Sequence, residues 1–368
     1  MELSRSQQLA LDYITNYARD HKLESKAIIN HILKMSNIPN DTFETAVSSL
    51  KANTRIGLHF HPDRPNADGK TVAELLLEQG IYRSQFETHL SNGSVSAFPG
   101  GERDQWEKRI FGGANQIEGT TNDQRPKYGA LNVKLHCDGP APRFGSCYFL
   151  LSPKVSFRST LTYLDSHQDP KEKGTYEEFD MILAALLEEA FTRESTIGQR
   201  DLTPTGLINH LLGNLNKKLP DLDKTEASRN LNHYIEAQVH GGISLEEDVE
   251  VLVADPSFKG TFIGTTLEKL CVKYLVDLYW HRGFNLSVDE VPSDFRGPSM
   301  PSLAARIAQN NGINANVIGC AVLDLHRIPQ NWKDRGTYKE VLQELKLLWH
   351  VLVRYGKPGT GGQVQCPG

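Results

Sequence analysis

Apolar residues recur every three to four positions through the N-terminal part of the chain, which is the spacing of one face of an α-helix. This pattern predicts an N-terminal helical region over residues 1–51. A second helical pattern covers residues 177–193, and helical spacing returns beyond residue 263. Between these regions, short apolar runs are bounded by glycine, proline and asparagine, as β-strands usually are.

The middle of the chain is predicted to supply a β-sheet. Its apolar runs predict strands at residues 54–60, 131–135, 146–151, 234–239 and 249–253. Residues 91–124 are rich in Gly, Ser, Asn and Asp, so we expect exposed loops there. Helices on both sides of a strand-rich middle predict an α+β fold. The expected domains are a helical region at 1–51, a core at 52–262 with a helical insertion at 170–233, a helical region at 263–355 and a disordered tail at 356–368.

Composition and charge exclude several classes of protein. The chain has 368 residues, of which 39% are hydrophobic and 23% charged, and its formal net charge is −5. This balance is ordinary for a globular protein and gives no indication of nucleic-acid binding. Apolar runs are shorter than the ~20 residues that cross a bilayer, so no membrane partner is expected. Residues 1–22 mix charged with apolar side chains, which predicts a soluble protein without a cleaved signal peptide. Delivery into a host cell by a specialised secretion system stays open.

The densest group of chemically active residues follows the first predicted strand, in the sequence LHFHPDRP at residues 58–65. His59 and His61 would face the same way in a strand, as metal ligands do, but the other histidines form no further ligand-spaced group. We therefore predict no metal site and keep a metal-dependent hydrolase as an alternative. His-Pro-Asp also resembles the loop of a J-domain, although a strand rather than a basic helix precedes it. In the third interpretation, Arg64 binds a phosphate group through its planar guanidinium.

Two further features lie downstream. Glu236 and Gln238 are predicted to share one face of a strand, opposite Ile235, Ala237 and Val239. A carboxylate in mid-strand is costly to desolvate unless it faces a cleft or a partner. Gly145 and Ser146 begin another predicted strand, where a glycine permits close approach of a ligand and a serine can orient a carboxylate or amide.

Three features follow one another along the chain: a basic residue at a strand end, a serine at a strand start and a glutamate within a strand. This order resembles the Arg–Ser–Glu triad of mono-ADP-ribosyltransferases. The blocks at residues 58–64, 125–132, 143–149 and 236–241 are similar to a bacterial family once catalogued as of unknown function. That family is identified as including the CteC-type effectors, which ADP-ribosylate a threonine of ubiquitin. The resemblance covers roughly residues 50–260.

The resemblance implies an ADP-ribosyltransferase-like split β-sheet core, NAD as co-substrate and ubiquitin as the protein substrate. It implies Glu236, Arg64 and Ser146 as catalytic residues. Contacts to NAD are expected from a wider set: His61, Arg64, Tyr128, Asn132, Gly145, Ser146, Tyr148 and Gln238. Either Arg64 or His61 would hold the dinucleotide, and we favour Arg64. An aromatic face suits the cationic nicotinamide ring, which makes Tyr128 and Tyr148 the candidates for stacking.

The chain departs from the family pattern at two places. Gly145-Ser146-Cys147 stands where the family usually has Ser-Thr-Ser or Ser-Thr-Thr. Tyr234 stands where arginine-modifying transferases carry Gln or Glu, which argues against an arginine acceptor and leaves hydroxyl acceptors open. The sequence also lacks a Gly-x-Gly-x-x-Gly or P-loop motif in a strand-to-helix context, so NAD would bind outside a Rossmann frame. The other alternative is a non-catalytic interaction protein.

Overall fold

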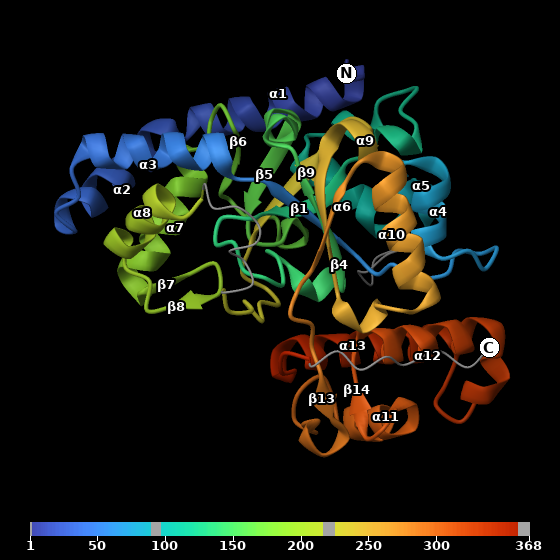
Figure 1. The fold of residues 1–368 in the computed structure, drawn as a ribbon. Coiled ribbons are helices and arrows are strands. Elements are labelled where there is room, and N and C mark those ends of the chain that lie inside the picture. Colours follow the sequence, from blue (N-terminus) through green and yellow to red (C-terminus); the bar gives the residue numbers. More distant parts are fainter. Residues whose placement is uncertain (1, 90–96, 216–224, 360–368) are drawn as a thin grey trace.

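The computed structural model describes residues 2–89, 97–215 and 225–359 (Figure 1). The predicted N-terminal helical region is confirmed as three helices: α1 (Arg5–Asp20), α2 (Lys22–Met35) and α3 (Asn40–Asn53). Ser4 begins α1 with a capping box, because its hydroxyl accepts the Gln7 amide while the Gln7 side chain accepts the Ser4 amide. No helix in the described part of the chain is long and apolar enough to cross a membrane.

Eight strands form one mixed sheet in the spatial order β12-β11-β4-β1-β3-β9-β5-β6. Their bounds are β1 (Ile56–Phe60), β3 (Lys127–Leu131), β4 (Cys147–Leu151), β5 (Ser159–Tyr163), β6 (Lys173–Thr175), β9 (Ile235–Val239), β11 (Val249–Ala254) and β12 (Asp277–Trp280). The pair β11–β12 is parallel and the other pairs in this sheet are antiparallel. Together with the flanking helices, this sheet confirms the predicted mixture of helices and strands.

The two faces of the sheet differ in polarity, as the alternation along β9 predicts. Ile235, Ala237 and Val239 point into the large hydrophobic core. Glu236 and Gln238 alternate with them and meet the polar side chains of the neighbouring strand β5, whose Thr162 pairs with Glu236 and Thr160 with Gln238. This second face therefore carries a stripe of buried polar groups.

Helices cover the sheet in separate groups (Figure 1). Within the expected helical insertion at 170–233, α7 (Asp180–Arg193) and α8 (Pro204–Gly213) pack on α2 and α3, while β6 belongs to the main sheet. The helices α11 (Met300–Ile307), α12 (Ala315–Arg327) and α13 (Tyr338–Tyr355) pack together in the C-terminal part of the chain. The Trp349 indole donates to the Pro142 carbonyl at 2.9 Å, which fixes α13 against the segment that precedes β4.

Three predictions about local structure were wrong or incomplete. The strand expected at 131–135 lies at Lys127–Leu131 instead. The segment expected to be loops, 91–124, contains the helix α6 (Glu102–Ile110), whose buried face is partly charged and so has no apolar signature. Beyond residue 263 the chain is not only helical, because β12 follows α10 (Phe262–Tyr274) and joins the sheet beside β11.

The remaining elements are short or lie at the margins. They are α4 (Val72–Gln79), β2 (Ile81–Tyr82), α5 (Gln85–Thr88), β7 (Ser195–Thr196), β8 (Gln199–Arg200), β10 (Ile243–Ser244), α9 (Leu245–Asp248), β13 (Leu286–Ser287) and β14 (Gly312–Ile313). At the start of the predicted disordered tail, Lys357 pairs its backbone with Asn285. The rest of that tail, residues 360–368, lies outside the described residues.

Candidate functional site

A cavity of about 380 Å³ lies where strands β1, β3 and β9 meet the helices α4, α6 and α13. This volume falls within the range of ligand-binding pockets, roughly 300–1,000 Å³. Its walls are chemically uneven. Two carboxyl groups, five Phe, Tyr or Trp rings and six Lys or Arg side chains line it, together with the apolar residues of α4.

Glu236 supplies the first carboxyl group. Its side chain is 5% exposed, and the Gln238 amide donates to its Oε1 at 2.9 Å while the Ser166 backbone N–H approaches its Oε2 at 3.5 Å. Burial, with the nearby charge of Asp165, raises the pKa of Glu236 to about 8. A pKa in this range favours the protonated form of Glu236 at neutral pH, and an adjacent cation would favour its ionised form.

Asp165 supplies the second carboxyl group, from the segment that follows β5. Its Oδ2 accepts the Tyr234 hydroxyl at 3.0 Å, and its Oδ1 accepts the His167 amide at 3.0 Å. We call Glu236 and Asp165 the acid pair. Asp165 was missed in the sequence, although the alternation in STLTY over residues 159–163 is a strand signal that would have placed it at a strand end.

Helix α6 contributes an aromatic and cationic wall. The Arg103 guanidinium lies 4.5 Å from the ring centroid of Trp106 and 5.1 Å from that of Tyr128. Arg103 is only 4% exposed, and its Nε has no hydrogen-bond partner among the described residues. The Trp106 indole donates to the Ser166 hydroxyl at 3.0 Å, which connects this wall to the acid pair.

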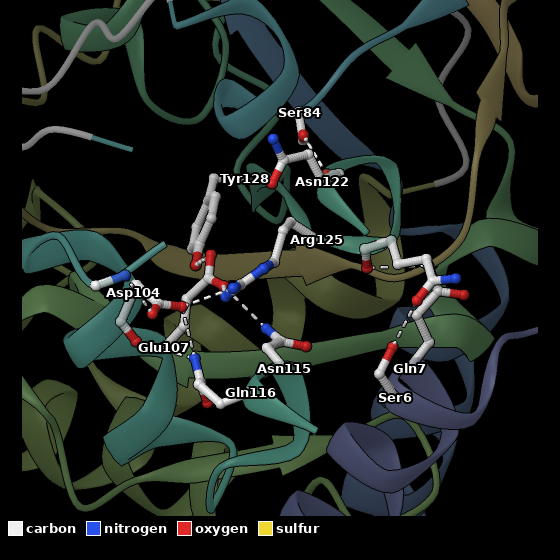
Figure 2. A network of polar contacts seen from close by, with 12 residues as sticks. Ser6, Gln7, Ser84, Asp104, Glu107, Asn115, Gln116, Asn122, Arg125 and Tyr128 are labelled. Carbon is white, nitrogen blue, oxygen red and sulfur yellow. Dashed lines mark hydrogen bonds and ion pairs between the residues drawn. The ribbon is translucent and has the colours of Figure 1, made fainter. Parts of the chain in front are cut away.

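A buried network holds the wall in place (Figure 2). Glu107 is fully buried and accepts hydrogen bonds from the Tyr128 hydroxyl at 2.8 Å, from Arg125 at 2.8 Å and from Asn115 at 2.9 Å. Arg125 also pairs with Asp104 at 2.6 Å. We call Asp104, Glu107, Arg125 and Tyr128 the Glu107 cluster. Because each charge in it has a partner, the cluster can stay buried and fix the ring of Tyr128.

The cavity is also strongly cationic. We call four of the cations that line it the collar: Arg64, Arg103, Arg143 and Lys346. No ion pair in the described ranges involves any of them. Buried nitrogens of Arg64, Arg103 and Arg143 also have no hydrogen-bond partner within the described part of the chain. An unpaired cluster of this kind is a site that favours an anion.

The histidines beside the collar are neutral. Burial, aided by the positive charge of Arg64, holds the pKa of His61 well below its usual value. Burial and the positive charges of Arg296 and Arg143 lower the pKa of His350 to about 2. Burial, together with the charge of Arg143, also lowers the pKa of Lys346 to about 8. The positive charges of the collar thus oppose protonation of the neighbouring histidines. A bound anion would reduce the repulsion between these cations.

Four of the nine predicted site residues line this cavity: Glu236, His61, Arg64 and Tyr128. The other five lie outside its lining. Gln238 acts on the cavity through its hydrogen bond to Glu236. Tyr148 stacks on His59 with ring centroids 4.8 Å apart and donates to the Cys137 carbonyl at 3.2 Å, so it is engaged by protein groups.

Ser146, Gly145 and Asn132 are buried behind the cavity. The Ser146 hydroxyl has no partner among the described residues, while its carbonyl oxygen lies 3.1 Å from His281 Nε2. Gly145 packs so tightly on the Phe60 backbone that a Cβ there would stand 2.3 Å from it, which explains the glycine. The backbone N–H of Asn132 donates to the Arg55 carbonyl at 2.8 Å, and Asn132 directly follows the last residue of β3.

His59 is used structurally. Its Nε2 accepts the Ala141 amide at 3.2 Å, and its Nδ1 donates to the Gly145 carbonyl at 3.1 Å. Both ring nitrogens are therefore occupied, and burial lowers the pKa of this imidazole to about 3. The His59–His61 pair thereby loses one of the two ligands on which a metal site would depend. Among the described residues, no group of three or more His, Cys, Asp or Glu side chains is placed to hold a metal.

Fold and cavity together describe a mixed α/β protein with a candidate site in which a buried glutamate and a half-buried aspartate lie in one cavity with the cationic collar. Residues 55–355 match the family of proteins of unknown function DUF3626, and the chain belongs to that family. The matched region begins with β1 and ends with α13, so it includes every residue of the acid pair and the collar. No curated protein matches the chain.

Proposed function

We propose that this protein is a mono-ADP-ribosyltransferase, an NAD-dependent glycosyltransferase that moves ADP-ribose from NAD to a hydroxyl side chain of a protein and releases nicotinamide. The observation that carries the proposal is the pairing of a buried glutamate with an unpaired cationic collar in one cavity. NAD has the complementary pattern, since it joins a cationic nicotinamide ring to an anionic diphosphate. Within the proposal, the sheet that carries Glu236 is an ADP-ribosyltransferase-like core.

Breaking the bond between ribose and nicotinamide builds positive charge on the ribose, as in glycoside hydrolysis. A carboxylate beside that ribose stabilises the transition state. Glu236 suits this role because its oxygens are held by Gln238 and the Ser166 backbone. Because the pKa of Glu236 is raised, binding of the cationic nicotinamide would promote ionisation of this carboxyl group. The carboxylate would then form once NAD is bound.

The collar supports a phosphate-binding role. Arg64 follows β1 and Lys346 lies on α13, and both line one cavity. Guanidinium groups bind phosphate oxygens in paired geometry. His61 lines the same cavity but is neutral, so it can orient a ligand without supplying charge. This difference favours Arg64 over His61 as the residue that holds the diphosphate.

Aromatic groups support a place for the nicotinamide. Tyr128 and Trp106 lie on the same side of the cavity as the acid pair, connected to it through Ser166. Tyr148 faces protein groups, so Tyr128 is the better stacking candidate of the two tyrosines. The acceptor is proposed from the sequence resemblance to be a threonine of ubiquitin, which implies a bacterial effector that acts inside a host cell.

The experiment is incubation of the purified chain with labelled NAD and ubiquitin. We expect label on ubiquitin with release of nicotinamide, and loss of both in Glu236→Gln, which preserves the size of the side chain. Glu246→Gln makes the same change at an exposed position of α9 and should retain full activity. Transfer that survives Glu236→Gln would contradict the assigned role of Glu236. Absence of NAD turnover in the parent would contradict the proposed function.

A further inference from the structure

Helix α13 carries a buried histidine whose two ring nitrogens are both unpartnered. His350 is only 2% exposed, and neither its Nδ1 nor its Nε2 has a hydrogen-bond partner among the described residues. A neutral imidazole offers one donor and one acceptor, and burial of both without partners is costly. His350 does not belong to the lining of the cavity, so a ligand confined to the cavity leaves this ring unexplained.

Arg296 approaches α13 from the segment that precedes α11. Its guanidinium lies over the ring of Phe295 at 5.1 Å, and that ring packs edge-on against Tyr355 of α13 with centroids 5.5 Å apart. The buried Nε of Arg296 has no hydrogen-bond partner in the described part of the chain. The backbone φ of Arg296 is 65°, in the left-handed region that side chains other than glycine rarely adopt. Residues held in this way are concentrated at ligand-binding sites.

Two members of the collar lie beside these residues. Lys346 precedes His350 by four positions on α13, so the two share one face of the helix. Arg143 belongs to the short helix η3 (Pro142–Phe144), which contacts α13. After burial, the charges of Arg296 and Arg143 do most to lower the pKa of His350, and both also lower the pKa of Lys346. We call Arg143, Arg296, Lys346 and His350 the α13 cluster.

The α13 cluster lacks counter-charge in the ranges that the structure describes. Its three cations form no ion pair there. Glu344 of α13 pairs instead with Arg335 at 3.0 Å, and Asp294, two residues before Arg296, is exposed. Three positive charges thus lie near one another with buried donor atoms unsatisfied, which is unfavourable for the protein alone.

Arg143 shows that the cluster is oriented by the fold. Its Nη1 donates to the Asn232 side-chain oxygen at 2.8 Å and to the Leu231 carbonyl at 3.1 Å. Its buried Nε has no partner among the described residues. One part of the guanidinium therefore fixes its orientation, and another part retains an unused donor. Because Arg143 and Lys346 also line the cavity, the α13 cluster adjoins it.

We propose that the α13 cluster binds a phosphomonoester, a terminal phosphate group with up to two negative charges. Guanidinium groups match phosphate oxygens in paired geometry, and the imidazole N–H of His350 adds a further donor. The inference is independent of the proposed reaction. The collar alone exceeds the two negative charges of an NAD diphosphate, and Arg296 adds to this excess. Two sources fit this chemistry: a 2′-phosphate on the bound dinucleotide, as in NADP, or a separate phosphate beside it.

The test begins with calorimetric titration of the full chain with inorganic phosphate. We expect the parent to bind phosphate and its Tm to rise, because the anion binds the folded state alone. Arg296→Met should weaken binding about tenfold and His350→Leu about threefold, and both should reduce the rise in Tm. Without phosphate, both variants should keep the Tm of the parent, since each loses groups that have no partner. Arg327→Met, a matched change at an exposed position of α12, should bind as the parent does.

Titrations with NAD and NADP then distinguish the two sources. A preference of the parent for NADP that is lost in Arg296→Met would assign the cluster to a 2′-phosphate. Equal affinities, with phosphate binding unchanged in saturating NAD, would assign it to a separate phosphate. Competition between phosphate and NAD without a preference for NADP would assign the cluster to the diphosphate and overturn the inference. A parent with a Kd for phosphate above about 10 mM would also overturn it, as would unchanged phosphate affinity in both Arg296→Met and His350→Leu.

Discussion

The molecule buries charged side chains in two adjoining places. In one they form ion pairs with each other, and in the other they do not. In the Glu107 cluster, Arg125 meets two carboxylates at 2.6 and 2.8 Å. In the collar, Arg103 is equally buried but lies over the rings of Trp106 and Tyr128 and forms no ion pair with a carboxylate among the described residues. Helix α6 contributes to both, since Asp104 and Glu107 turn toward Arg125 while Arg103 lines the cavity.

The difference separates structure from function. A buried charge with a close partner is retained at little net cost, and the fold depends on both partners. A buried charge without a partner costs desolvation free energy that the folded protein does not recover internally. Such a group persists where a ligand completes it, so the collar is the better indicator of function.

The largest expected effect comes from making the same substitution in both places. Arg125→Met leaves Glu107 and Asp104 buried without their cation, and we expect it to lower the free energy of unfolding by about 3–5 kcal/mol. Arg103→Met removes stacking on two rings and a longer-range attraction to Glu107, for which we expect a loss of no more than about 2 kcal/mol. Urea unfolding at pH 7 measures both. Equal losses would mean that Arg103 also has a stabilising partner, and the comparison would fail.

The second prediction concerns the pH dependence of stability at Glu236. Its pKa is about 8 in the folded protein and about 4.5 when unfolded, so the folded state retains the proton longer. Stability from this group is therefore lost as pH rises from about 4.5 to about 8. We expect Glu236→Gln to gain up to about 4 kcal/mol over the parent between pH 5 and pH 9. Paired urea unfolding curves at the two pH values measure the gain.

Glu246→Gln provides the control for this measurement. Glu246 is exposed on α9, so its substitution should leave the difference between pH 5 and pH 9 as it is in the parent. A constant difference between Glu236→Gln and the parent at all pH values would show that Glu236 has an ordinary pKa in the folded protein and is ionised at neutral pH. In that case the protein itself would stabilise the ionised carboxylate of Glu236, as it does the charges of the Glu107 cluster.

The same contrast explains what could be predicted from the sequence. The α+β class and the orientation of Glu236 follow from apolar spacing, because the apolar residues of β9 face the core and Glu236 faces the cavity. Helix α6 could not be predicted that way, since its buried face includes Arg103, Asp104 and Glu107. These residues can be buried because they contact Arg125 and Tyr128. Both lie beyond the loop that follows α6, so the pattern within the helix does not show these contacts.

Only one member of the collar, Arg64, is predicted from the sequence as a phosphate-binding residue. Arg103, Arg143 and Lys346 come from three separate segments, and each alone has the appearance of an ordinary surface cation. Ser146 shows the opposite error. A glycine followed by a serine at a strand start suits a ligand site, yet here close packing on Phe60 accounts for Gly145, and Ser146 lies outside the cavity lining.

The third prediction addresses the collar directly. Inorganic pyrophosphate should bind the parent and raise its Tm, because a bound anion stabilises the folded state alone. We expect Lys346→Met to weaken this binding about tenfold, the effect of losing one phosphate contact of ~1.4 kcal/mol. Isothermal titration calorimetry measures the Kd. Lys339→Met, an exposed substitution on the same helix, should bind as the parent does. Equal affinity in Lys346→Met would remove Lys346 from the collar.

The smallest expected effect concerns Tyr128, which contributes both to the Glu107 cluster and to the cavity. Tyr128 gives its hydroxyl to Glu107 at 2.8 Å, while its ring lines the cavity. Tyr128→Phe should therefore cost about 1 kcal/mol of stability, the usual value of one hydrogen bond, and leave the Kd for NAD unchanged. Tyr128→Leu removes the ring as well and should weaken NAD binding severalfold, because stacking on a cation contributes about 1 kcal/mol. Urea unfolding and calorimetric titration with NAD separate the two effects. If Tyr128→Phe weakened NAD binding as much as Tyr128→Leu, the Glu107 cluster would be part of the ligand site, and the division between paired and unpaired charge would not hold.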